Sequence, residues 1–317
     1  MSKKILLSGV KPTGRPHIGN YFGAMKQFVE MQNEYECYFM LADYHALNFI
    51  QEGGEMKQGI LDLALDYLAL GLDPQKSVIF KQSDVSEHTE LTWIFDSITT
   101  MPFLERAHAY KDAEAKDKEI SVGTFNYPML MASDILLYDT DIVPVGQDQK
   151  QHVEYTRDTA QKFNHVFKKE VFKLPDVKIL EEVAVVPGTD GKKMSKSYGN
   201  TIPLFATDEE IEKAVMGIVT DSSGDVPENV YAIHRLLKTE DELKDLYEEN
   251  KGKYKALKEA LIVDMKEFIK PLREKRDQLA HDLDYGMDVL KEGGKRAKQR
   301  AEKKMDEVRE AVGVKLY

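Results

Sequence analysis

Short apolar runs alternate with amphipathic stretches through the first part of the chain. Residues 4–10, 37–42 and 78–80 form apolar runs of the kind that buried strands contain. Residues 18–29 and 60–72 lie between these runs and repeat their apolar positions at helical spacing. This strand–helix–strand–helix–strand order predicts a parallel sheet whose crossover connections are right-handed.

The regular pattern is interrupted from about residue 102 to residue 123. Within this segment, residues 111–119 are almost entirely charged residues and alanine, so we expect an exposed or mobile insertion. The pattern then resumes with a predicted helix, a strand, a second helix and a final pair of strands. These predictions cover residues 129–138, 142–145, 148–167 and 177–186.

Beyond residue 203 the strand-like runs stop and only helical periods remain. We therefore predict an α/β fold, with a Rossmann-like parallel sheet in a first domain of residues 1–202 and a helical domain of residues 203–317. The predicted C-terminal helices cover residues 208–219, 229–237, 241–249, 254–283 and 287–312.

Composition narrows the class of protein without identifying a function. With 317 residues, of which 42% are hydrophobic, the chain can bury a sizeable core and form two domains. The single cysteine, Cys37, excludes an internal disulfide framework, and no apolar run suits a membrane helix or a signal peptide. We therefore expect a cytoplasmic protein. The net charge of −11 argues against a general nucleic-acid coat, although a local basic face can still form.

The first motif that carries chemistry is Pro16-His17-Ile18-Gly19-Asn20, which opens the first predicted helix. In open α/β sheets ligands bind beyond the carboxyl ends of the strands, and free amides at a helix N-terminus favour phosphate. Gly19 permits close backbone approach, while His17 and Asn20 can donate hydrogen bonds to phosphate oxygens. An ordinary loop with a capping histidine would give the same pattern. A P-loop fits less well, because Arg15-Pro16 stands where its lysine and hydroxyl residue belong.

The second motif, Lys193-Met194-Ser195-Lys196-Ser197, lies in a polar loop that contains glycine. Lys193 and Lys196 can neutralise the charge that builds on phosphate during displacement, and the two serines can bond phosphate or the loop backbone. A lysine cluster alone usually marks a solvated surface loop. The two motifs in this order are a stronger signal than either alone, and they indicate an ATP site.

Five segments of the chain resemble the bacterial tryptophanyl-tRNA synthetase family, which belongs to class I of the aminoacyl-tRNA synthetases. The segments are residues 8–14, 17–21, 131–138, 141–152 and 193–197. The resemblance is close over most of the first domain and looser over the helical one. It implies a Rossmann-like catalytic domain, a helical domain that reads the anticodon of tRNA, and a homodimer.

The resemblance also implies which residues form the site. The expected catalytic residues are His17, Asn20, Lys193 and Lys196. ATP is expected to contact Lys11, Pro12, Thr13, Gly19, Asn20, Gly146, Gln147, Asp148, Lys193, Met194, Ser195, Lys196 and Ser197. Tryptophan is expected to contact His45, Tyr127, Met131, Asp134 and Gln149. Two positions depart from the family pattern, because Lys11 replaces the usual glutamine and Ala42 replaces a larger aliphatic residue.

Asp134 lies in an otherwise apolar helical stretch, residues 129–137. Its carboxylate must either be paired inside the protein or turn outward at the edge of the stripe. The resemblance implies that it accepts the indole N–H, and a buried carboxylate suits that task because an indole nitrogen can only donate. His45 and His152 are weaker candidates, since a single histidine is more often structural.

The last predicted helix carries a cluster of basic residues. In the family the helical domain contacts tRNA, so the cluster is a candidate for phosphate binding. A solvated face balanced by neighbouring acidic residues explains the cluster equally well. The basic residues are Lys291, Lys295, Arg296, Lys298, Arg300, Lys303 and Lys304.

The resemblance implies a reaction in two steps. The carboxylate of tryptophan attacks the α-phosphate of Mg-ATP and releases pyrophosphate, and the 2′-hydroxyl of the terminal tRNA adenosine then accepts the tryptophanyl group. The first step needs no general base, so positioning and charge stabilisation carry it. We expect Mg²⁺ to arrive with ATP, without a separate protein metal site.

Three alternatives remain open from the sequence. The first is a tyrosyl-tRNA synthetase of the same class, which shares the fold and both ATP motifs. The second is a tRNA-independent nucleotidyltransferase, since such enzymes also carry a His-x-Gly motif on a similar sheet. The third is a paralogue without catalysis that binds tryptophan or tRNA.

Overall fold

The computed structural model of the chain describes residues 3–107, 110–111, 114, 119–146, 150–179, 186–220 and 224–317. Within these residues, five parallel strands form one sheet in the order β3-β2-β1-β4-β5. Strands β2 and β3 follow β1 on one side, and β4 and β5 are added on its other side. The strand order therefore reverses between β1 and β4. Ligands bind at this point in open α/β sheets. The strands are β1 (Ile5–Val10), β2 (Glu36–Leu41), β3 (Ser77–Lys81), β4 (Ile142–Val145) and β5 (Asp176–Ile179).

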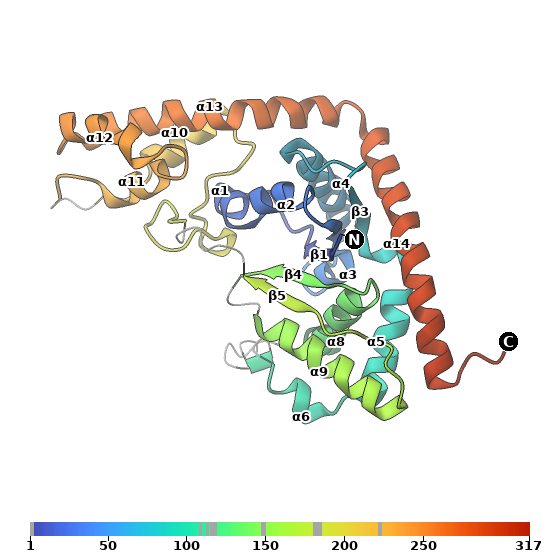
Figure 1. Ribbon diagram of the computed structural model, residues 1–317. Helices are drawn as coiled ribbons and strands as arrows, with labels where there is room; N and C mark the ends of the chain where they lie inside the picture. The colour runs from blue at the N-terminus through green and yellow to red at the C-terminus, as the bar shows by residue number, and fades with distance from the viewer. Residues whose placement is uncertain are drawn as a thin grey trace.

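The strands are apolar along their length because helices cover both faces of the sheet (Figure 1). Leu6 of β1 belongs to one apolar cluster, whereas its neighbours Ile5 and Leu7 belong to the other. The first face packs against α1 (Ile18–Asn20), the π-helix η1 (Tyr21–Met25), α2 (Lys26–Met31) and α4 (Gly53–Leu70). The second packs against α5 (Glu87–Ile98), α8 (Val122–Leu136) and α9 (Lys150–Phe167).

Within the described residues the predicted helices and strands are confirmed in type, with some shifts at their ends; of the strand pair predicted within residues 177–186, one strand, β5, is described. The second predicted helix ends at Gly71, whose φ of 104° is left-handed and suits a residue without a side chain. Helix α8 begins at Val122, inside the segment predicted as an insertion. The same segment begins with the short helix α6 (Met101–Leu104). Parts of three predictions lie outside the described residues. These are residues 112–113 and 115–118 of the insertion, residues 148–149 of a helix and residues 180–185 of the last strand pair.

Besides α6, three short elements and one full helix within the described residues were not predicted. The short elements are α3 (Asp43–Ala46) and the 3-10 turns η2 (Gln82–Asp84) and η4 (Lys196–Tyr198). The full helix is α5, which buries Glu87 and His88 beside Leu91 and Phe95. Its inner face is therefore half polar, which weakens the hydrophobic period that reveals a helix.

The C-terminal region contains the five predicted helices. Helices α11, α12 and the start of α13 share an apolar cluster around Leu243, Tyr247 and Leu257, whereas α10 packs into the first apolar cluster. Helix α13 then returns to the sheet, where Arg276 bonds Asp66 and Asp62 of α4 at 2.5 and 2.6 Å. The helices are α10 (Asp208–Met216), α11 (Glu228–His234), α12 (Glu240–Glu249), α13 (Tyr254–Ala280) and α14 (Leu283–Val312).

Helix α14 packs across β3, the strand at one edge of the sheet (Figure 1). Gly293 allows this contact, because a Cβ atom there would lie 1.8 Å from the carbonyl oxygen of Ile79. Farther along the helix, Ala297, Ala301 and Met305 are fully buried in the second apolar cluster. The last helix thus protects an exposed strand edge and completes the core of the first domain.

Candidate active site

The N-terminal motif lies directly beyond the carboxyl end of β1, where His17 precedes helix α1. Asn20 turns back to accept a hydrogen bond from the backbone N–H of His17, at 3.1 Å. The His17 side chain is buried, and a Cβ atom at Gly19 would lie 2.9 Å from its Nδ1. Glycine at position 19 therefore makes room for the imidazole beside the start of the helix.

His17 is an uncharged donor or acceptor at neutral pH. Burial, and then the charge of Lys196, lower the pKa of His17 to about 4. Its Nδ1 is buried and has no hydrogen-bond partner within the described residues. A buried nitrogen without a partner is costly, so this position is suited to a ligand that supplies one.

Asn200 holds the lysine motif in a compact loop. Its Oδ1 accepts the backbone N–H of Ser195 at 2.8 Å, and its Nδ2 donates to Asp190 at 2.6 Å. Gly191, with a φ of +81°, makes the turn between these partners. Asn200 was missed in the sequence, because its partners are set by the loop conformation and no spacing rule reveals them.

The two motifs meet although most of the catalytic domain separates them in sequence. The backbone N–H of Ile18 donates to Ile202 at 3.0 Å, and that of Leu204 donates to Pro16 at 2.9 Å. The Lys196 ammonium donates to the carbonyl oxygen of Gly14 at 2.9 Å and to that of Thr13. Both of these acceptors are neutral, so the positive charge of Lys196 is not cancelled by the loop that it contacts.

The other residues predicted for ATP surround the same edge of the sheet. Lys11 follows β1, and its ammonium lies 4.2 Å from the centre of the Phe49 ring. The Pro12 carbonyl approaches Gly59 of α4, where a Cβ atom would come within 2.5 Å. Gly146 directly follows β4. Gln147, Asp148 and Gln149 lie outside the described residues.

The remaining members of the lysine motif differ in exposure. Met194 is buried and packs against the first apolar cluster, and a Cβ atom at Gly19 would lie 3.4 Å from its own Cβ. Lys193 and Ser197 are exposed, and Ser195 is half-buried. The buried methionine therefore anchors the loop, while the polar side chains around it point to its surface.

Asp134 is buried, and three polar side chains from three other elements surround it. Gln82 donates to its Oδ1 at 2.7 Å, and His88 Nδ1 lies 2.6 Å from the same oxygen. His45 Nε2 lies 2.8 Å from its Oδ2. The outward-facing alternative for Asp134 is wrong, because the carboxylate is 2% exposed.

The surroundings of Asp134 favour its ionised form. Burial alone would raise the pKa of this carboxyl group, but the contacts with His88 and His45 outweigh burial and hold the pKa below its usual range. Asp134 is therefore a buried anion, and its lone pairs can only accept hydrogen bonds.

Two other residues predicted for tryptophan lie near this carboxylate. The Tyr127 hydroxyl is 2.7 Å from His152 Nε2, and its ring meets His45 edge to face at 6.1 Å between ring centres. Met131 is half-buried at the edge of the second apolar cluster. His45, Tyr127 and Asp134 thus come together as predicted, with His152 beside them.

Gln82 and His88 were not among the predicted site residues. Gln82 is fully buried at the carboxyl end of β3, and its Oε1 also accepts the backbone N–H of Tyr44 at 3.1 Å. Its place directly after a strand is a usable signal, because ligands bind at that edge of the sheet. His88 gives no such signal, since only the packing of α5 on α8 brings it to Asp134.

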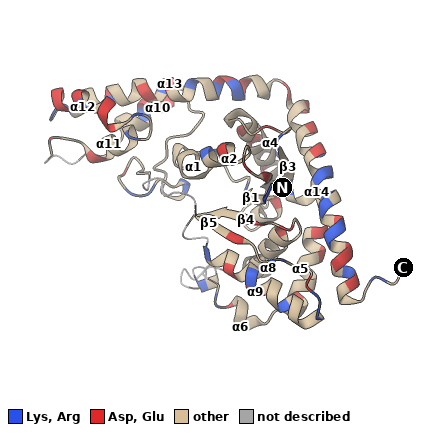
Figure 2. Cartoon of the chain, in the orientation of Figure 1, with Lys and Arg blue, Asp and Glu red and all other residues tan. Residues whose placement is uncertain are grey.

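The basic cluster of α14 only partly faces solvent. Arg296 donates to the carbonyl oxygen of Pro74 at 3.1 Å, and Arg300 donates to that of Tyr138 at 2.7 Å. Lys304 is buried and lies 2.8 Å from Asp139. These three side chains fix the helix to the catalytic domain, which neither interpretation of the cluster included. Figure 2 shows basic and acidic residues mixed along the helix.

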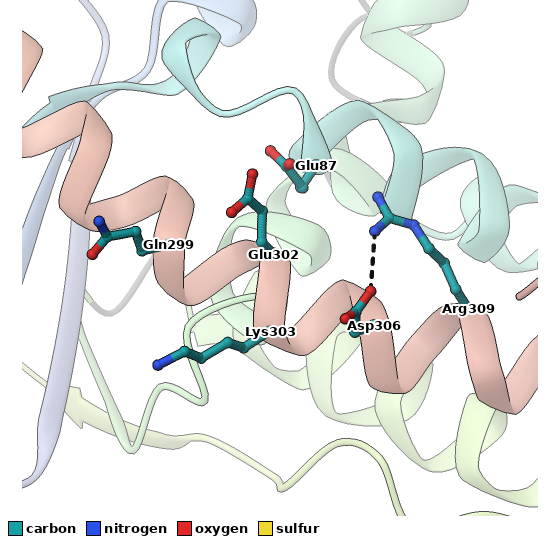
Figure 3. A pocket seen from close by; sticks show the side chains of 6 residues that line it. All are labelled: Glu87, Gln299, Glu302, Lys303, Asp306 and Arg309. Atoms are coloured by element: carbon teal, nitrogen blue, oxygen red, sulfur yellow. Dashed lines mark ion pairs between the residues drawn. The ribbon is translucent and has the colours of Figure 1, made fainter. Parts of the chain in front are cut away.

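A surface hollow between α5 and α14 contains none of the predicted site residues (Figure 3). It carries three carboxylates and two basic side chains, and Arg309 lies 3.5 Å from Asp306, one turn earlier on the same helix. Its excess of negative charge disfavours a polyphosphate. The lining residues are Glu87, Gln299, Glu302, Lys303, Asp306 and Arg309.

Comparison with known proteins agrees with this geometry. The family described as tRNA synthetases class I (W and Y) matches residues 2–277. A protein of Fusobacterium nucleatum named tryptophan–tRNA ligase is 48% identical over 97% of both chains. One of Rhodopirellula baltica with the same name is 44% identical over 98% of this chain and 99% of the relative.

Solved structures extend the likeness to three dimensions. The tryptophanyl-tRNA synthetase of Campylobacter jejuni, complexed with ADP and tryptophan, is 44% identical and superposes with a TM-score of 0.92 over 98% of this chain and 99% of its own. A tyrosyl-tRNA synthetase of Archaeoglobus fulgidus is 20% identical, with a TM-score of 0.68 over 87% of this chain and 90% of its own, and shares the fold alone. The chain belongs to the class I tRNA synthetases (W and Y).

Proposed function

We propose that this chain is a tryptophan–tRNA ligase, which activates L-tryptophan with ATP and transfers it to tRNA(Trp). The observation that carries the proposal is Asp134, a buried anion with a lone pair for an indole N–H. Its partner Gln82 directly follows β3, at the edge of the sheet where the two ATP motifs also lie. The names of the Fusobacterium and Rhodopirellula relatives support it, as do the ADP and tryptophan in the Campylobacter structure.

The ATP side of the site is proposed to consist of the two motifs that meet beyond β1. The His17 imidazole would bond phosphate oxygens, with Gly19 allowing the backbone to come close. Lys196 would exchange its two carbonyl acceptors for phosphate charge as that charge develops. Catalysis then consists of orienting the tryptophan carboxylate toward the α-phosphate and stabilising the leaving pyrophosphate.

Mg²⁺ is proposed to enter with ATP rather than through a site of its own. No group of three or more histidine, cysteine, aspartate or glutamate side chains suited to a metal occurs in the part of the chain that the structure describes. Magnesium commonly keeps several waters and binds to substrate phosphates, and this arrangement suits it.

The tryptophan side is proposed to consist of Asp134, His45, Tyr127 and Met131. The nitrogen of an indole donates and cannot accept, so a carboxylate recognises it while leaving phenylalanine without a partner. The phenol of tyrosine can also donate, and only its different shape and reach separate it from indole. Tyrosine is therefore the competitor that the experiment must include.

A second copy of the chain is the proposed partner of an exposed apolar face. Trp93 of α5 is 74% exposed and Val122 of α8 is 81% exposed, and these two helices pack together. Asp96, on the same helix as Trp93, keeps one buried oxygen without a described partner.

Trp93→Glu should convert a dimer to a monomer in sedimentation velocity. A wild-type monomer at micromolar concentration would contradict the proposal. The exposed apolar residues in this region are Leu47, Phe49, Trp93, Met101 and Val122.

The helical region, residues 203–317, is proposed to contact tRNA, in an enzyme that works in the cytoplasm. The structure describes no helix with the length and apolar composition of a membrane span. Lys291 and Lys295 of α14 are exposed and are the best candidates for phosphate contacts. The double variant Lys291→Ala/Lys295→Ala should lower tRNA charging and leave pyrophosphate exchange unchanged.

Amino-acid-dependent exchange of pyrophosphate into ATP tests the proposed activity. Tryptophan should support exchange, whereas the other nineteen amino acids, tyrosine included, should support little. Charging of tRNA(Trp) should follow with the same enzyme. Exchange that depends on tyrosine would make the chain a tyrosyl-tRNA synthetase, and exchange without charging would favour a nucleotidyltransferase.

A further inference from the structure

The two oxygens of Asp134 have unequal surroundings. Oδ1 has two partners, Gln82 and His88, at 2.7 and 2.6 Å. Oδ2 has one described partner, His45 at 2.8 Å. Each carboxylate oxygen offers about two lone-pair sites, so Oδ2 retains one acceptor site, whereas Oδ1 is occupied by the Gln82 hydrogen bond and by the close contact with His88 Nδ1.

His88 contacts the carboxylate from the interior of the protein, whereas His45 contacts it from a side that is partly open to solvent. The His88 side chain is 0% exposed, whereas that of His45 is 13% exposed. The His88 ring stacks on Phe80 at 6.4 Å between ring centres and is held rigidly between β3 and α8. Oδ1 therefore faces the interior, and Oδ2 faces the side on which its neighbour His45 is partly exposed.

A third buried group fixes His88. Its Nε2 lies 2.8 Å from the Tyr138 hydroxyl, so each ring nitrogen of His88 has a polar neighbour. Nε2 forms a hydrogen bond with the Tyr138 hydroxyl, whereas Nδ1 lies against the carboxylate as a close polar contact without hydrogen-bond geometry.

Tyr138 is in turn held in place from two sides. Its ring stacks on Tyr38 at 5.0 Å between ring centres. Its carbonyl oxygen accepts a hydrogen bond from Arg300 of α14 at 2.7 Å. The chain Arg300–Tyr138–His88–Asp134 thus links the last helix of the protein to the buried carboxylate.

We propose that His88, supported by Tyr138, is a specificity-determining positioning residue that holds Asp134 so that its free Oδ2 lone pair points at the indole N–H. The inference rests on the proposed function, in which Asp134 reads tryptophan. His88 does not touch the substrate and acts only through the carboxylate. Its loss should therefore affect ligands that carry a ring N–H and spare those that do not.

The experiment compares L-tryptophan with L-3-benzothienylalanine, which replaces the ring N–H by sulfur. Pyrophosphate exchange gives kcat/KM for both ligands, and calorimetry gives their affinities. A hydrogen bond to a charged group corresponds to a preference of about 10- to 150-fold, which wild-type enzyme should show for tryptophan. Equal use of both ligands by wild type would overturn the role of Asp134 and the present inference together.

His88→Leu keeps the volume of the ring approximately and removes both of its polar contacts. The preference for tryptophan should fall to within about threefold, mainly through a higher KM for tryptophan. His88→Asn retains a donor toward Asp134 and should restore much of the preference. In an Asp134→Asn background, His88→Leu should change the preference no further. An equal loss of kcat/KM for both ligands in His88→Leu would show a structural role only and overturn the proposal.

Two further variants keep the test decisive. Tyr138→Phe removes one oxygen and should lower the preference by about two- to fivefold. If His88→Leu does not fold, an unchanged preference in Tyr138→Phe overturns the proposal. His234→Leu is the matched control, because His234 is equally buried and also lies between a carboxylate, Asp264, and a tyrosine hydroxyl. It should leave the preference for tryptophan unchanged, and a matching loss in this variant would overturn the proposal.

Discussion

Asp134 in the catalytic domain and Asp264 in the helical region occupy similar surroundings, but they leave different groups available. His234 Nε2 lies 2.7 Å from Asp264, and its Nδ1 lies 3.1 Å from the Tyr247 hydroxyl. Lys238 adds a cation 2.7 Å from the second oxygen of Asp264. The described partners of Asp134 are two imidazoles and an amide, with no lysine or arginine among them.

The difference separates a structural carboxylate from one that is available to a ligand. Burial acts to raise the pKa of Asp264, and the Lys238 and His234 contacts overcome it, so the group is ionised but already matched by a full positive charge. Its negative charge is used within the protein. No lysine or arginine is among the described contacts of Asp134, whose ionised form is favoured by His88 and His45.

The largest expected effect concerns Lys196. Lys196→Ala should slow single-turnover adenylate formation by roughly 100- to 1000-fold and leave tryptophan affinity within about twofold, because the charge is needed mainly in the transition state. Lys192→Ala, an exposed residue of the same loop, is the control and should change the rate by less than about threefold. An unchanged rate in Lys196→Ala would remove this lysine from the catalytic group.

The second prediction compares tryptophan affinity after replacement of Asp134 and of Asp264. Asp134→Ala should weaken tryptophan binding by about 10- to 150-fold in calorimetry, because a hydrogen bond to a charged acceptor is lost. Asp264→Ala should leave tryptophan affinity unchanged. Comparable losses of affinity in the two variants would mean that both carboxylates act through the fold, and the comparison would fail.

Asp264→Ala should instead lower stability. Removing this carboxylate leaves His234 buried without its partner, which typically costs about 1–3 kcal/mol of the free energy of unfolding. Urea denaturation measures the change. Asp264→Asn, which keeps an acceptor for His234, should recover part of the loss. A variant as stable as wild type would show that the Lys238 and His234 contacts contribute nothing net.

The last prediction concerns pH. His17 has a folded-state pKa of about 4, below its usual 6.5, so the unfolded chain binds its proton first as pH falls. Its contribution to stability is complete above pH 6.5 and is lost as the pH falls toward 4. His17→Asn should therefore flatten the decline of unfolding free energy between pH 6.5 and 4, as measured by urea denaturation at several pH values. A decline as steep as that of wild type would mean that His17 is not buried in its neutral form.

Local patterns predicted most elements of the fold, because both faces of the sheet are covered and its strands are apolar runs. Helix α5 escaped prediction since Glu87 and His88 occupy its buried face. The path of α14 across β3 also escaped, because helical periodicity shows which face is apolar but not what that face contacts. Because of that contact, Arg296 and Arg300 bond backbone carbonyl groups of the catalytic domain, although the sequence had made them candidates for tRNA binding.

The site residues also fall into those that local sequence patterns predict and those that they do not. Residues in the two motifs could be predicted, since each motif is a continuous string with a recognisable chemistry. Asp134 could be predicted from its place in an apolar stretch together with the family resemblance. Gln82, His88 and Asn200 act through contacts with residues distant in the chain or set by a loop conformation, and neither kind of contact leaves a periodic trace in the sequence.

The packing of α14 has a consequence for synthesis on the ribosome. When residue 280 has been added, every residue proposed for ATP or tryptophan already exists, but the helix that covers β3 does not. The edge of β3 and the apolar surface beneath Ala297, Ala301 and Met305 remain open until that helix emerges. A nascent chain stopped before this point therefore exposes a strand edge that favours aggregation. The core of the catalytic domain is therefore closed only after α14 has been synthesised.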